Sequence, residues 1–492
     1  MKLSRRLLLL ALCLLVPLQS LAIDGPVYEV FVASFADGDG DQRGDLKGLT
    51  QKLDYIADLG VAGIWLMPIS PSPSYHKYDV TDYKAIDPAY GTMADFAALS
   101  AASDERGLSL ILDLVLAHSS SQHPWFLEAS QALAKGDSTP YTDYYMFNQQ
   151  GGHPVPGASG WYYEGHFGPH MPHLNLDSAA LRDEIREIMA FWLAAGADGF
   201  RLDATAHYYE NNTAKNTAFL EWLVQTARDI NPKVYFVAEA WTDAGTILSL
   251  SESGIDSLFN FPMAGATGTL VEDLRNEKGE ALSNRVEGWQ ASLLGRNPGA
   301  VDAPFLSNHD MARSAGYLMF KPQRMKLAAA VYLTMPGIPY VYYGEELGLS
   351  GSGRDENKRL PMLWSAQDTA SNTLPPADAD QNQRLKAGVD VQQEDPESLL
   401  RFYQHVLSLR RQHPEFTRGV ASAIATCQPA LAAWRLEMDG KSITVVHNLS
   451  DQRAVYAVNG LALAGSWDTG SGLPTVQGSK LILPGYSGAI LR

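Results

Sequence analysis

Short apolar runs alternate along this chain with stretches whose apolar residues recur at helical spacing. The apolar runs lie at 28–36, 63–70, 109–118, 199–204, 234–241, 257–262, 302–310 and 338–346. Stretches with helical periodicity, such as 48–60, 180–196 and 324–337, separate them. Strands separated by helices pair in parallel, and eight strand–helix units close a (β/α)8 barrel. We therefore predict an α/β protein built on a TIM barrel. A doubly wound open sheet is the alternative, although no GxGxxG turn follows the first run.

Two parts of the chain interrupt this alternation. Residues 119–177 separate the third apolar run from its helix and are rich in Gly, Pro, His and aromatic residues, which predicts a small inserted domain. From 415 to 492 the pattern changes to short alternating strands with Gly and Asp turns, which predicts a C-terminal antiparallel β-sandwich domain. The barrel would then comprise 23–118 and 178–414.

The first residues, 1–22, show the pattern of a secretory signal peptide. Basic residues precede an apolar run, and Ser20 and Ala22 follow it at the spacing of a cleavage site. Pro17 interrupts the apolar run, which argues against a retained membrane anchor, and Leu12 before Cys13 argues against a lipoprotein. No later segment is long and apolar enough to span a bilayer. We expect an exported protein, either periplasmic or extracellular.

The formal net charge of −17 argues against nucleic acid as a partner, because phosphate backbones are themselves anionic. Loss of Lys2, Arg5 and Arg6 with the signal peptide makes the chain still more acidic. Only Cys427 would remain, so the mature protein has no intramolecular disulfide. We expect a monomer whose ligands are neutral molecules, small cations or metal ions.

Polar residues gather where several apolar runs end. They are Asp113 and His118, Arg201 and Asp203, Glu239, and His309 and Asp310. In a barrel these ends share one face, which carries the chemistry of barrel enzymes. Acids from four of the apolar runs, with no Cys–His or Ser–His arrangement near them, favour carboxylate catalysis. Glycoside hydrolysis uses one ionised carboxylate and one protonated acid. Taken singly, each acid also suits an ion pair or a helix cap.

Arg201 and Asp203 are two residues apart, so in a strand their side chains point to the same face. A buried charge is costly unless it is paired. The two residues therefore form either a structural ion pair or a carboxylate that a cation keeps ionised for chemistry.

Five motifs, in order along the chain, resemble those of the α-amylase family of glycoside hydrolases. They are YHKYDVTDY (75–83), DLVLAH (113–118), GFRLDATAH (199–207), AEAW (238–241) and FLSNHD (305–310). The resemblance implies a TIM barrel with a domain inserted after the third strand and a C-terminal β-sandwich. It also implies an enzyme that hydrolyses or transfers α-glucosyl units with retention of configuration.

The resemblance implies a role for each acid. Asp203 matches the nucleophile, which Arg201 keeps ionised, and Glu239 matches the general acid/base. Asp310 matches an acid that holds sugar hydroxyls. Tyr78 matches an aromatic platform, although it and His76 also suit packing. The substrate-binding residues implied are His76, Tyr78, Asp113, His118, Arg201, His207, His309 and Arg359.

The bond that is cleaved is harder to infer than the reaction class. Family members that cleave α-1,6 bonds tend to carry Val after the nucleophile, whereas this chain has Ala204. Trp241 after Glu239-Ala240 resembles α-1,4 cleavers, and MPHLN (171–175) is typical of members between the groups. We therefore expect internal cleavage of α-1,4 bonds in starch-like glucans, the activity of an α-amylase. A maltooligosaccharide-specific glucosidase, a glucanotransferase and a non-catalytic sugar-binding relative remain alternatives.

The stretch DGDGDQRGD (37–45) concentrates acids directly after the first apolar run. Hard cations such as Ca²⁺ take many oxygens from one flexible loop. We expect one Ca²⁺ here, held by Asp37, Asp39, Asp41, the Arg43 carbonyl and Asp45; a solvated acidic turn is the alternative. The stretch also resembles a calcium loop of many family members.

A second calcium, which many α-amylases hold between the inserted domain and the barrel, is expected to be absent. The positions of its Asn and Asp ligands carry Ala117 and His173. Alanine offers no side-chain oxygen, and a hard cation prefers oxygen to imidazole nitrogen. The His207 carbonyl alone is too little, so we expect packing and hydrogen bonds to join the two parts.

Overall fold

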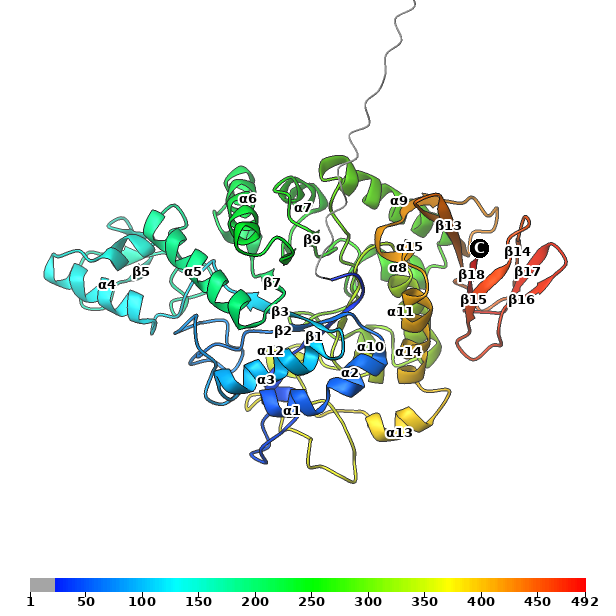
Figure 1. Cartoon of the computed structure of the whole chain (residues 1–492), viewed down its shortest axis with the longest axis horizontal. Coiled ribbons are helices and arrows are strands. Elements are labelled where there is room, and N and C mark those ends of the chain that lie inside the picture. The colour runs from blue at the N-terminus through cyan, green and yellow to red at the C-terminus, as the bar shows by residue number, and fades with distance from the viewer. Residues whose placement is uncertain (1–22) are drawn as a thin grey trace, which may run out of the picture.

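A parallel sheet that curves into a barrel forms the centre of the structure (Figure 1). The computed structural model describes residues 23–492, so the expected signal peptide lies outside the described residues. Seven strands pair in the order β10-β1-β2-β3-β7-β8-β9. They are β1 (Val27–Val30), β2 (Gly63–Leu66), β3 (Ser109–Leu114), β7 (Gly199–Leu202), β8 (Tyr235–Ala238), β9 (Ser257–Leu258) and β10 (Tyr340–Tyr342). Nearly all of their residues are buried, as expected of a parallel sheet covered by helices.

The seventh apolar run does not form a regular strand. Pro304 lies in it, and proline has no N–H to donate to a ladder. Instead, isolated parallel bridges pair Phe259 with Ala303 and Phe305 with Tyr340. These bridges join β9 to β10, so the predicted barrel is confirmed, with its seventh position held by single bridges.

Helices follow the barrel strands and cover them on the outside. The longer ones are α3 (Met93–Asp104), α5 (Ala179–Ala195), α6 (Thr213–Ile230), α9 (Gly279–Arg296), α11 (Pro322–Leu333) and α14 (Leu399–Arg411). The shorter ones are α1 (Leu46–Gln51), α2 (Leu53–Leu59), α7 (Ala244–Ser251), α8 (Thr269–Arg275), α10 (Ser314–Tyr317), α12 (Asp355–Lys358), α13 (Val389–Glu394) and α15 (Glu415–Arg418). Local chemistry sets their ends: α5 begins where the Ser178 side chain accepts from Leu181 N–H and ends at Gly196, whose φ is 109°. Among the described helices, none is long and apolar enough to cross a membrane.

The segment between β3 and α5 projects from one end of the molecule (Figure 1). It contains α4 (Pro124–Lys135), η2 (Pro140–Tyr144) and a small sheet of β4 (Phe147–Asn148), β5 (His153–Pro154) and β6 (Tyr162–Tyr163). Its link to the barrel includes a bridge from His118 to His173, and Nε2 of His173 lies 3.2 Å from the Tyr208 carbonyl oxygen. These contacts join the segment to the barrel.

Antiparallel strands form the opposite end of the molecule (Figure 1). One sheet contains β11 (Val420–Ala423), β12 (Leu431–Met438), β13 (Lys441–Asn448), β18 (Gly488–Leu491) and β15 (Leu463–Trp467), and the other β14 (Ala454–Ala457), β17 (Lys480–Leu483) and β16 (Thr475–Gln477). Leu431, Val446, Leu481 and Leu483 are buried together between them. The opposite face of the larger sheet, which includes Trp434, joins the main core. The predicted C-terminal β domain is therefore present.

A buried acid ties the end of β10 to two outer helices. Glu345, in the short helix η4 (Glu345–Leu347), accepts hydrogen bonds from the hydroxyls of Tyr332 in α11 and Tyr403 in α14, at 2.9 and 3.0 Å. Burial raises the pKa of Glu345 to about 7, although these hydroxyl donors oppose the rise.

We predict that Glu345→Gln alters how stability depends on pH. The folded pKa of about 7 lies above the ordinary value of 4.5, so the contribution of the protonated carboxyl is complete below pH 4.5 and is lost as the pH rises to about 7. Gln does not titrate, so the variant should gain about 2–3 kcal/mol relative to wild type between about pH 4.5 and pH 8. Denaturant unfolding at both pH values measures this gain. The exposed control Glu394→Gln should show none, and an equal gain in both variants would contradict the assignment.

Candidate active site

One buried arginine connects acids from three neighbouring strands. Arg201 lies in β7, and its side chain is fully buried. Its Nη1 lies 2.8 Å from Oδ1 of Asp113 in β3 and 2.6 Å from Oδ1 of Asp203, the residue after β7. Its Nη2 lies 2.7 Å from Oε2 of Glu239, the residue after β8. The parallel register places Asp113 beside Arg201, so all three acids converge at the carboxyl ends of the strands.

Aromatic residues hold the guanidinium in place. Its central carbon lies 5.0 Å from the ring centroid of Trp65 and 5.7 Å from that of Tyr78. Trp65 Nε1 and the Tyr78 hydroxyl also donate to Oδ2 of Asp113, at 3.2 and 3.0 Å. The arginine and its first carboxylate partner are therefore fixed by packing and by hydrogen bonds.

A turn after β7 holds Glu239 against Asp203. Ala204 adopts a left-handed backbone conformation, with a φ of 48°. Its N–H donates to Oε2 of Glu239 at 2.8 Å, and the N–H and hydroxyl of Thr205 donate to the Glu239 carbonyl at 2.8 and 2.6 Å. Both side-chain contacts of Glu239 use Oε2, which leaves Oε1 as the oxygen suited to carry a proton.

Asp310 lies in a different electrostatic environment. Its Oδ2 lies 3.0 Å from Nε2 of His309, and its Oδ1 lies 3.0 Å from Nη2 of Arg359. Burial alone would lower the pKa of His309, but Asp310 and Glu29, whose Oε1 lies 2.6 Å from Nδ1, raise it to about 9. Burial likewise opposes ionisation of Asp310, yet His309, Arg359 and Arg201 together hold its pKa well below the usual range. Asp310 is therefore an anion at neutral pH.

Asp203 and Glu239 both contact Arg201, and both have raised pKa values. Burial raises the pKa of each to about 6, against the opposing charge of Arg201. Asp113 adds to the rise at Asp203, and Asp203 adds to the rise at Glu239. Two acids that share one cation lose their protons in coupled steps. The pair is thus suited to hold a single proton in mildly acidic solution.

The three acids open into a cleft of about 600 Å³. The predicted residues that line it are Asp203, Glu239, Asp310, His76, Tyr78, His118, His207 and Arg359. Asp113, Arg201 and His309 do not line the cleft: Arg201 and His309 contact its acids, and Asp113 contacts Arg201. His118 is itself largely buried, with Nε2 3.1 Å from the Tyr78 carbonyl oxygen, and burial lowers its pKa to about 3. It is therefore a neutral polar group in the cleft wall.

Several residues of the site were not predicted from the sequence. Phe167, His170, Met171, Trp241, Asp355 and Lys358 also line the cleft. Trp241 is 54% exposed and stacks on Phe261, with ring centroids 5.4 Å apart. An aromatic ring exposed beside a carboxylate suits the apolar face of a sugar. The AEAW motif contains this tryptophan, but the motif alone does not show that its ring is exposed in the cleft.

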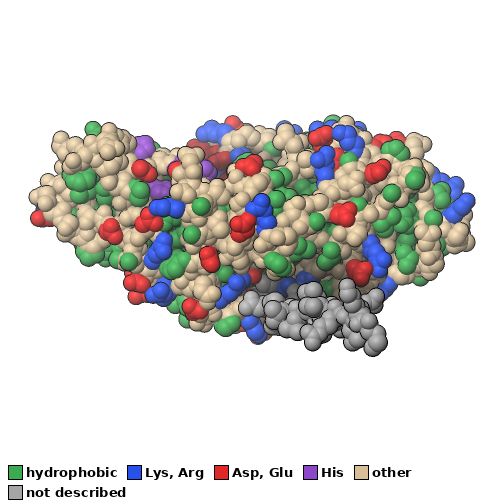
Figure 2. All heavy atoms as spheres, turned by 90° about the horizontal axis from the view of Figure 1, so that it is seen from above, with side chains coloured by type: hydrophobic (Ala, Val, Ile, Leu, Met, Phe, Trp, Pro, Cys, Tyr) green, Lys and Arg blue, Asp and Glu red, His purple; other side chains and the backbone are tan. Residues whose placement is uncertain are grey.

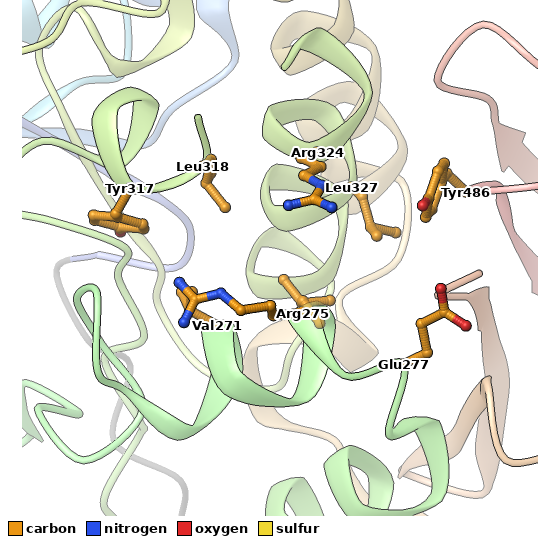
Figure 3. Close-up of a pocket in the computed structure, with 9 residues that line it drawn as sticks. Val271, Arg275, Glu277, Tyr317, Leu318, Arg324, Leu327 and Tyr486 are labelled. Atoms are coloured by element: carbon orange, nitrogen blue, oxygen red, sulfur yellow. The ribbon is translucent and has the colours of Figure 1, made fainter. Parts of the chain in front are cut away.

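A second hollow lies away from these acids, between α8, α11 and the C-terminal strands (Figure 3). Its volume of about 40 Å³ is far smaller than the volume of the cleft. Leu327 and Val271 line it together with Arg275, Arg324 and Glu277. It holds one acid and no paired carboxylates, so the chemistry belongs to the larger cleft.

The loop 37–45 brings part of its predicted ligand set together. Ligand oxygens of Asp37, Asp39 and Asp45 lie within 4.8 Å of one another, which suits a hard cation. Asp41 is not in this group; its Oδ1 accepts from the Arg43 N–H at 2.7 Å instead. The loop thus offers three grouped carboxylates rather than the four that were expected.

A barrel that gathers two coupled carboxylates and a third, ionised acid at the carboxyl ends of its strands has the architecture of a carboxylate-based glycoside hydrolase. Comparison with known proteins agrees, because residues 29–419 match the family model described as the catalytic domain of alpha amylase. The chain belongs to the alpha-amylase family of glycoside hydrolases.

Individual relatives span nearly the same length. The chain is 38% identical over 435 residues to Alpha-amylase 3 of Dictyoglomus thermophilum, covering 86% of this chain and 84% of that protein. It is 29% identical over 449 residues to a 4-alpha-glucanotransferase of Thermotoga neapolitana, covering 87% and 96%. The solved structure of Eubacterium rectale Amy13B superposes with a TM-score of 0.91 at 37% identity, covering 96% of each chain.

We predict that Arg201→Met destabilises the fold as well as abolishing activity. Removing the cation leaves three buried carboxylates uncompensated, and breaking a buried ion pair typically costs about 3–5 kcal/mol. Thermal unfolding at neutral pH measures this loss. Adding Asp113→Asn to Arg201→Met removes one of the stranded charges, so the double variant should be more stable than Arg201→Met alone. If the double variant loses as much stability as Arg201→Met and Asp113→Asn lose together, the two residues act independently. That result would contradict the sharing of one cation by the three acids.

Proposed function

We propose that the protein is a retaining α-amylase that cleaves internal α-1,4 bonds of starch-like glucans. The observation that carries this proposal is that Asp203 and Glu239 share the guanidinium of Arg201 while both line one open cleft. The preference for α-1,4 bonds rests on Ala204 and Trp241 and on the likeness to an alpha-amylase.

In the proposed reaction the two carboxyl groups have separate roles. Asp203, in contact with Arg201 through Oδ1, attacks the anomeric carbon, while Glu239 donates a proton to the glycosidic oxygen as that bond breaks. The product is a covalent glycosyl–enzyme and a free sugar end. Glu239 then removes a proton from water, which attacks the same carbon, releases Asp203 and retains the configuration.

The remaining predicted residues position the substrate in this proposal. Asp310 accepts hydroxyl hydrogen bonds as an anion, and His309 and Arg359 hold it in that state. Tyr78 presents a ring under the sugar, and His207 and Trp241 lie on the leaving-group side. His76 and His118 supply further polar groups in the cleft wall, while Asp113 supports Arg201 from behind.

A glucanotransferase is the second candidate. The relative from Thermotoga neapolitana carries that name, and the exposed face of Trp241 offers a stacking surface on which an acceptor sugar can compete with water. Transfer differs from hydrolysis only in what attacks the glycosyl–enzyme.

Product analysis on starch, maltotriose, pullulan and isomaltose tests the proposed activity. We expect short maltooligosaccharides from starch, with a rapid fall in iodine staining because internal bonds are cut. Oligosaccharides longer than maltotriose, formed from maltotriose alone, would favour transfer. Glucose released from isomaltose, with starch left intact, would overturn the α-1,4 assignment.

We predict that Asp203→Asn, Glu239→Gln and Asp310→Asn each lower kcat/KM by several orders of magnitude without unfolding the protein. Proton NMR of the first product should show the α-anomer, since retention requires the two carboxyl groups about 5–5.5 Å apart. The dependence of kcat/KM on pH should be bell-shaped, because one acid must be ionised and the other protonated. The β-anomer as first product, or near wild-type turnover by any of the three variants, would refute the assigned roles.

We also propose that one Ca²⁺ binds the loop 37–45 and that the calcium between inserted segment and barrel is absent. Asp37, Asp39 and Asp45 supply the grouped oxygens, whereas Ala117 and His173 replace oxygen ligands of the other ion. Export, a monomeric state and the domain limits 119–177 and 415–492 remain part of the same proposal.

Calcium removal should lower the melting temperature without changing the catalytic residues. We predict one calcium per chain after reloading, and loss of that ion in Asp37→Ala/Asp39→Ala, because both remove grouped carboxylate oxygens and such oxygens dominate binding by these loops. Atomic absorption and thermal unfolding measure both effects. A second tightly bound calcium that survives the double variant would contradict the absence of the interdomain site.

A further inference from the structure

Two histidines and a glutamate meet at the rim of the cleft. His166 lies in the inserted segment after β6, His207 ends η3 (Thr205–His207), and Glu210 follows three residues later. The Nδ1 atoms of His166 and His207 lie 2.9 and 3.0 Å from the same oxygen, Oε1 of Glu210. The two rings lie 4.2 Å apart between centroids, with 30° between their planes. Figure 2 shows histidine side chains (purple) close together on the surface toward the end that carries the inserted segment.

This trio has the donor atoms of an open zinc site. Two imidazole nitrogens and one carboxylate oxygen form a common three-ligand set for zinc, and the fourth position is then left to water. One ligand atom from each side chain lies within 4.8 Å of the other two. A nitrogen-rich set favours zinc-class ions over calcium, which prefers oxygen. The cluster therefore differs in kind from the acidic loop 37–45.

The present spacing is close to what an ion requires. Ligands bound tetrahedrally at 2.0–2.1 Å lie about 3.3 Å apart, so the contacts of 2.9 and 3.0 Å need to widen by only a few tenths of an ångström. The three side chains are 34 to 40% exposed, which lets them shift and lets an ion reach them from solution.

We propose that His166, His207 and Glu210 bind a zinc-class divalent ion that fastens the inserted segment to the barrel. Two of the ligands follow β7 on the barrel side, and the third comes from the segment, so one ion would link the two parts. His207 also lines the cleft, which places the ion at the edge of the substrate path. The ion would thus stabilise the wall of the cleft.

A metal-free arrangement is the competing explanation. Oε1 of Glu210 can accept hydrogen bonds from both imidazoles, which satisfies the trio without an ion. The two explanations differ in the response to added metal: a hydrogen-bonded trio gains no stability from zinc, whereas a metal site gains it by mass action.

The test is calorimetric titration of the metal-stripped full chain with zinc at neutral pH, with calcium present in excess to occupy hard-cation sites. We expect one zinc per chain, a higher melting temperature with zinc, and visible d–d absorption when cobalt replaces zinc. His166→Ala and Glu210→Gln should each weaken zinc binding at least about tenfold, since each removes one of three ligands. His170→Ala, which removes another histidine of the same segment, is the matched control and should leave the site intact.

Every other outcome overturns the proposal. Zinc that binds wild type without raising its melting temperature, or that binds both ligand variants as tightly as wild type, would exclude the site. Several zinc ions could instead bind weakly, with His170→Ala reducing this binding as much as the two ligand variants do. That result would show unspecific association of zinc with surface histidines. If excess calcium prevents zinc from binding or from raising the melting temperature, the site prefers calcium, and the proposed zinc-class ion is wrong.

Discussion

The guanidinium of Arg201 contacts three carboxylates, at the carboxyl ends of β3, β7 and β8. Such a cluster adds little to stability, because the cost of removing charges from water offsets much of their attraction. Its effect is chemical. Burial raises the pKa values of Asp203 and Glu239, and the single cation that they share with Asp113 opposes this rise without cancelling it. The barrel strands position Arg201, and the charge of Arg201 limits how far burial raises the pKa values of Asp203 and Glu239.

Asp310 shows how the same cleft produces the opposite result. It is as close to its neighbours as the other acids are, but two cations, His309 and Arg359, contact it directly. Its pKa is therefore low while that of Glu239 is high. Acids whose environments separate their proton affinities are the arrangement that acid–base chemistry at one pH requires. This difference in pKa between Asp310 and Glu239 depends on Glu29, because the Glu29 carboxylate contacts Nδ1 of His309 and stabilises the positive charge of that imidazole.

The barrel and its acids were predictable because both follow from local periodicity. Asp203 and Glu239 each end an apolar run, and a parallel register brings such ends together. Glu29 and Phe167 were not predicted, since their roles arise only from contacts between distant segments; Glu29 meets a histidine 280 residues away. The apolar content of 302–310 predicts a seventh strand, but Pro304 has no N–H to donate to a ladder.

That proline has a consequence for how the barrel moves. The segment carrying His309 and Asp310 is held by isolated bridges rather than by a continuous ladder. Backbone amides along this seam should exchange with solvent sooner than those of β2 or β3, because fewer ladder bonds must open together. The acid proposed to accept sugar hydroxyls therefore follows a segment paired by isolated bridges, whereas Arg201 lies in β7, which pairs along its length with β3 and β8.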